Sequence, residues 1–167
     1  QESRGLGDVY KRQIDTHCAE GEISYMIPHD TLYCPDHFKN CQLPATPINN
    51  KLAFGFSVPG THYFPMQFFE AKYVLTADPF PLTHVNDPEN EMSHKLNEMF
   101  LAVRDEYFAL EETFDMGNGT TFTIWRRTKA PTRAEVEYYL SAFTEEDAKY
   151  PEMFSQVAEN WLAARGL

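Results

Sequence analysis

Residues 73–77 restrict the fold of this chain more than any other segment. The run is largely apolar, has the length of a strand and stops at Asp78-Pro79. Runs of this kind are typical of strands that are buried on both faces of a parallel sheet. We therefore predict that residues 73–77 form a central strand.

Two further strands are expected earlier in the chain. Residues 22–28 are rich in β-branched and aromatic side chains, and apolar and smaller residues alternate in residues 51–59. A helix that ends near residue 20 is predicted to precede the first of these strands, because Gly21 can adopt the left-handed conformation that closes a helix. Residues 29–41 are expected to form a turn and a short helix. The aromatic segment 59–71 is predicted to be a loop that covers one edge of the sheet.

The second half of the chain shows clear helix and hairpin signals. A helix is predicted to begin at Pro88, because Asp87 can cap it and proline suits the first helical position. Residues 107–114 and 120–128 are expected to pair antiparallel around Asn118-Gly119, a dipeptide that favours tight hairpin turns. Two helices should follow. Thr132 and Glu135 form a capping-box pattern at the start of one, and the other is predicted to run from Pro151 to a stop at Gly166.

These elements predict an α/β fold with a layered mixed sheet of about five strands and flanking helices, with the hairpin at the edge of the sheet and two helices after it. Residues 14–167 have the length of one domain. Residues 1–13 resemble a translated sequencing-adapter tail, so we exclude them from the fold as non-native or disordered. The chain is accordingly expected to be a fragment of a longer protein.

Charge and cysteine content argue against two classes of protein. A formal net charge of −11 opposes nucleic-acid binding, which needs clustered Lys and Arg. Cys34, His37 and Cys41 lie close in the sequence but lack the paired spacing of structural zinc sites, so no metal is expected. With Cys18 the chain has three cysteines, which allow one disulfide at most, and we favour buried small side chains.

Asp78 is the first candidate site residue, because α/β sheets bind ligands at the carboxyl ends of their strands. The sequence Asp78-Pro79-Phe80-Pro81 also resembles the acidic or amide, proline, aromatic motif of amino-group methyltransferases, which use S-adenosylmethionine. That family requires an upstream glycine-rich loop, and the only Gly-x-Gly here lies at residues 5–7, within the excluded segment. The structural alternative is that Asp78 caps a turn and the prolines end the strand.

Histidines in expected loops are the other candidates. His29, His62 and His84 could act as general bases of a hydrolase, but spacing alone does not bring them together, and no nucleophile motif accompanies them. If the domain contacts a glycan or lipid, the candidates lie in the aromatic loop: His62, Tyr63, Phe64, Phe68 and Phe69. Packing in the core or at a sheet edge is the alternative for most of these.

Several phrases of the chain resemble a known family. The succession ISYMI, YCPDHFKN, FFEAKYVLTADPFP and FDMGNGTTFTIWRRT is similar to the soluble C-terminal region of bacterial multi-spanning membrane glycosyltransferases of the dolichyl-phosphate-mannose protein mannosyltransferase group. The most specific phrases are AKYVLTADP, from Ala71 to Pro79, and Trp125-Arg126-Arg127 at the end of a later strand. Together the phrases cover most of residues 14–128.

The resemblance implies a location and little chemistry. Enzymes of this group transfer sugar from a polyprenyl-phosphate carrier, using an acidic residue in an early external loop that this chain does not contain. It implies an accessory, non-catalytic domain on the extracytoplasmic side of the cell membrane, attached to the membrane-embedded remainder of its chain and without a cofactor. Asp78, His62, Tyr63 and His84 are the residues we expect to contact a glycan or lipid-linked acceptor. The alternatives are a soluble enzyme fragment similar to methyltransferases and a free-standing interaction module.

Overall fold

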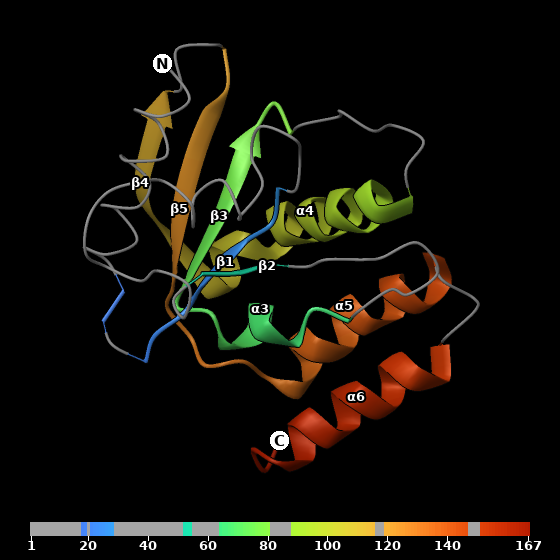
Figure 1. The fold of residues 1–167 in the computed structure, drawn as a ribbon. Helices are drawn as coiled ribbons and strands as arrows, with labels where there is room; N and C mark the ends of the chain where they lie inside the picture. Colours follow the sequence, from blue (N-terminus) through green and yellow to red (C-terminus); the bar gives the residue numbers. More distant parts are fainter. Residues whose placement is uncertain are drawn as a thin grey trace.

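A computed structural model of the protein describes residues 18–19, 21–28, 52–54, 64–80, 88–115, 119–146 and 151–167. These residues form a mixed sheet with helices gathered on one side of it (Figure 1). The strands are β1 (Ser24–Met26), β2 (Leu52–Phe54), β3 (Tyr73–Asp78), β4 (Phe108–Asp115) and β5 (Thr121–Arg127). The helices are α3 (Met66–Glu70), α4 (Pro88–Tyr107), α5 (Arg133–Glu146) and α6 (Pro151–Ala163). The predicted α/β class is confirmed.

Strand β3 lies at the centre of the sheet, whose order is β2-β1-β3-β5-β4. It pairs parallel with β1 on one side and antiparallel with β5 on the other. Its residues from Tyr73 to Ala77 are all at most 5% exposed. The prediction of a buried central strand is therefore confirmed, and so is the antiparallel β4–β5 hairpin at the edge of the sheet.

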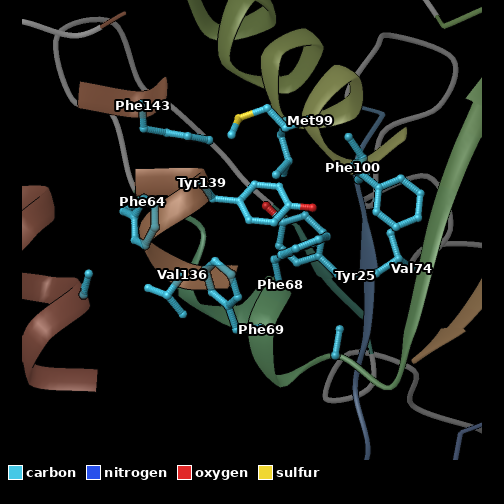
Figure 2. Close-up of a cluster of buried hydrophobic side chains, with 14 of the residues drawn as sticks. Tyr25, Phe64, Phe68, Phe69, Val74, Met99, Phe100, Val136, Tyr139 and Phe143 are labelled. Carbon is cyan, nitrogen blue, oxygen red and sulfur yellow. The ribbon is translucent and has the colours of Figure 1, made fainter. Parts of the chain in front are cut away.

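Aromatic side chains form the core between the sheet and the helices (Figure 2). Phe68 lies at the middle of this cluster, with ring centroids 5.6 Å from Tyr25 of β1, 6.1 Å from Phe100 of α4 and 5.0 Å from Tyr139 of α5. Aromatic pairs at these separations add to the stabilisation that burial of their area provides. A second cluster, built around Leu75 and Phe122, covers the opposite face of β3.

The prediction of a loop over residues 59–71 is wrong at Met66–Glu70, because these residues form the short helix α3. Phe68 and Phe69 are 0% and 1% exposed, so they lie inside the core and do not cover an edge of the sheet. A helix of five residues is too short to show a hydrophobic period in the sequence. Its formation depends on the tertiary contacts that bury the two adjacent phenylalanines.

The ends of α4, α5 and α6 follow the predicted signals. Helix α4 begins at Pro88, and the hydroxyl of Thr132 accepts a hydrogen bond of 3.1 Å from the backbone N–H of Glu135 at the start of α5. After α6, Gly166 has a φ of 70°, and the backbone N–H of Leu167 donates to the carbonyl of Leu162 at 3.1 Å. This is the hydrogen-bond pattern of a helix closed by a left-handed glycine.

The start of the described chain agrees only in part with the prediction. Gly21 has the expected positive φ of 84°, but Cys18 and Ala19 are not helical, and the rest of the helix predicted before them lies outside the described residues. Cys18 is buried and its sulfur lies 2.8 Å from the Ser24 hydroxyl, as expected for a small buried side chain. The other two cysteines lie outside the described residues. None of the described helices is both long and apolar enough to cross a membrane.

Candidate site at the carboxyl edge of the sheet

The carboxyl ends of β1, β2 and β3 point to the same edge of the sheet, because these three strands are parallel. In the order β2-β1-β3, the two strands that come after β1 in the sequence, β2 and β3, lie on opposite sides of it. In open α/β sheets, ligands bind outside the carboxyl ends of strands where the strand order reverses in this way. The edge beside β1 and β3 is therefore the candidate site.

Asp78 is the last residue of β3 and is exposed at this edge. It lies opposite Thr121, the first residue of β5, which in turn lies opposite Asp115 at the end of β4. Three polar side chains thus form one row across the edge. A carboxylate in such a row can accept hydrogen bonds from hydroxyl or amine groups of a ligand.

Two buried polar side chains lie beneath Asp78. Thr76, two residues earlier on the same face of β3, donates a short hydrogen bond from its hydroxyl to Oδ1 of Asn97 on α4. Both residues are almost fully buried, at 5% and 6% exposed. A buried polar group is costly unless it is paired, so this bond fixes α4 against the carboxyl end of β3.

His94 stands on α4 one turn before Asn97 and packs against the segment that follows β3. Its ring lies edge-on to Phe80, with the two centroids 4.5 Å apart. Both side chains are partly exposed. Among the described residues, no hydrogen bond or ion pair joins His94 to Asp78. The described contacts therefore place a carboxylate and an imidazole near one edge without forming an acid-base pair.

The structure tests only part of the predicted site. Asp78 lies where the sequence predicted, whereas His29, His62, Tyr63 and His84 lie outside the described residues. Three of the five aromatic-loop candidates have another role: Phe64, Phe68 and Phe69 belong to the core and cannot contact a glycan from there. The structural alternative that the sequence left open is confirmed for these three.

Sequence reasoning missed Thr76, His94 and Asn97. A signal for Asn97 was present, because it interrupts the helical face that carries Leu96 and Phe100, where a polar residue needs a buried partner. Thr76 was hidden in an apolar strand, where threonine is common for its β-branched shape alone. His94 gives no signal without the position of Phe80.

The residues Trp125-Arg126-Arg127, which contribute to the family resemblance, are all used in internal contacts. Trp125 packs against Phe100, and Arg126 pairs with Glu111 at 2.9 Å. Nη1 of Arg127 donates to both carboxylate oxygens of Glu135, at 3.0 and 2.9 Å. The Arg127 side chain is 8% exposed and that of Glu135 is 0% exposed. Burial raises the pKa of Glu135, and the neighbouring charge of Arg127 opposes that shift.

Within the part of the chain that the structure describes, no group of three or more His, Cys, Asp or Glu side chains is placed to hold a metal ion. Comparison of the chain with models of protein families, with curated proteins and with solved structures finds no match.

Proposed function

We propose that this chain is an accessory, non-catalytic domain of a membrane glycosyltransferase that transfers sugar from a polyprenyl-phosphate carrier, and that it lies on the extracytoplasmic side of the cell membrane. One observation supports the proposal: the two most specific of the resembling phrases contribute residues to the interior of the domain. Residues 73–77 are its buried central strand, and Arg127 is held in a buried ion pair. The phrases on which the resemblance rests therefore include residues that pack inside the fold.

In this role the carboxyl edge of the sheet contacts the acceptor or the glycan. Asp78 is exposed there and can accept hydrogen bonds from sugar hydroxyls, while Phe80 offers an apolar surface two residues later. In this role both contacts position the ligand, and neither takes part in a chemical step. The domain then affects how well the acceptor binds and leaves the chemical step to the membrane-embedded remainder of the chain.

A soluble enzyme of the methyltransferase kind is the second candidate. Asp78, Pro79 and Phe80 lie at the carboxyl end of the central strand, beside the point where the strand order reverses, which is where such an enzyme would hold its substrate. Titration of the chain with S-adenosylmethionine in a calorimeter tests this candidate. Saturable micromolar binding would favour it over the accessory domain.

The first test of the proposal is to read the DNA upstream of the codon for Ile14 in the source material. Several membrane-spanning segments with an acidic first external loop are expected. A start codon close to Ile14, or a glycine-rich nucleotide loop, would contradict the proposal.

The second test uses that full reading frame, expressed in membranes and assayed for sugar transfer from a polyprenyl-phosphate donor. Asp78→Asn should raise KM for the acceptor several-fold and leave kcat within about twofold, because uniform binding interactions act on KM. Glu152→Gln, which changes an exposed carboxylate on α6, is the matched control. A hundredfold fall in kcat for Asp78→Asn alone would make the domain catalytic and overturn the proposal.

A further inference from the structure

We draw no further inference here: the strongest candidate, the exposed apolar patch of Leu101 and Leu110 where the second half of α4 meets the β4–β5 hairpin, carries none because nothing in the described part of the structure shows what covers it.

Discussion

Removing one partner of the buried Arg127–Glu135 pair should destabilise the domain severely. In Glu135→Gln the side chain at position 135 keeps its size, but Arg127 loses the negative charge that neutralises its guanidinium. Water cannot replace that partner, because the Arg127 side chain is only 8% exposed. The carbonyls of Ala71 and Phe68, at 3.4 and 3.5 Å, are weak substitutes. Breaking a buried pair in this way costs about 3–5 kcal/mol. Since small domains have about 5–15 kcal/mol in total, the variant should lose a large part of its stability.

Removing both partners should cost much less. In Arg127→Met with Glu135→Leu no buried charge is left unpaired, and the new side chains can pack against Phe68 and Phe108, which already contact the Arg127 guanidinium. Replacement of a buried ion pair by apolar residues is often neutral or stabilising. The double variant is therefore expected within about 1 kcal/mol of the wild type.

Urea unfolding followed by circular dichroism measures these differences, provided that the slope of the unfolding curve is unchanged among the variants. Arg126→Met is the matched control, because Arg126 pairs with Glu111 at a more exposed site and should cost less than about 1 kcal/mol. If Glu135→Gln lowered the free energy of unfolding no more than this control, the assignment of a mutually dependent buried pair would be refuted. It would also be refuted if the double variant lost as much stability as single variants at Arg127 and Glu135 lose together.

Three further predictions address the core and the surface. Val74→Asp should prevent folding, because an unpaired charge at a site that is 0% exposed costs several kcal/mol. An unchanged melting temperature would exclude the buried central strand. Tyr139→Phe should raise the free energy of unfolding by about 1 kcal/mol, because the buried hydroxyl has no hydrogen-bond partner among the described residues. Burial also raises the pKa of this hydroxyl. A lower stability of the variant in urea would show that the hydroxyl is paired. Glu22→Gln should lower the melting temperature at pH 7 and lower it by less at pH 3, since the hydrogen bond from Lys72 holds the pKa of Glu22 below its ordinary 4.5, and the stabilisation is lost as pH falls below the ordinary value and through the lowered one. An equal effect of Glu22→Gln at both pH values would show that the stabilisation by Glu22 does not depend on its charge.

The large elements could be predicted because their signals are local. Strand β3, the β4–β5 hairpin and the helices α4, α5 and α6 each have a hydrophobic period, a cap or a turn residue within their own sequence. Helix α3 could not be predicted in this way. Its five residues become helical where the core receives Phe68 and Phe69, and that core is assembled from β1, α4 and α5, which are far away in the sequence.

Only one residue of the candidate site could be placed from the sequence. Asp78 follows a recognisable strand, so its place at a carboxyl edge could be inferred from the sequence alone. The bond between Thr76 and Asn97 spans 21 residues, and the contact of Phe80 with His94 joins a strand end to a helix. Both depend on how α4 lies on the sheet, which no local pattern in the sequence specifies.

The register of the sheet separates the residues of the candidate site from the residues that stabilise the core. Three successive rows on the helix face of β3, β5 and β4 run from Val74, Trp125 and Leu110, through Thr76, Thr123 and Thr113, to Asp78, Thr121 and Asp115. Along β3 the side chains change from 0% exposed at Val74 to 5% at Thr76, and Asp78 at the end of the strand is exposed to solvent. Polarity therefore rises toward the carboxyl edge as burial falls. A substitution at Asp78 changes a solvated group and leaves the core intact, so a change in acceptor binding by Asp78→Asn can be interpreted as an effect on the site, whereas a change at Val74 cannot.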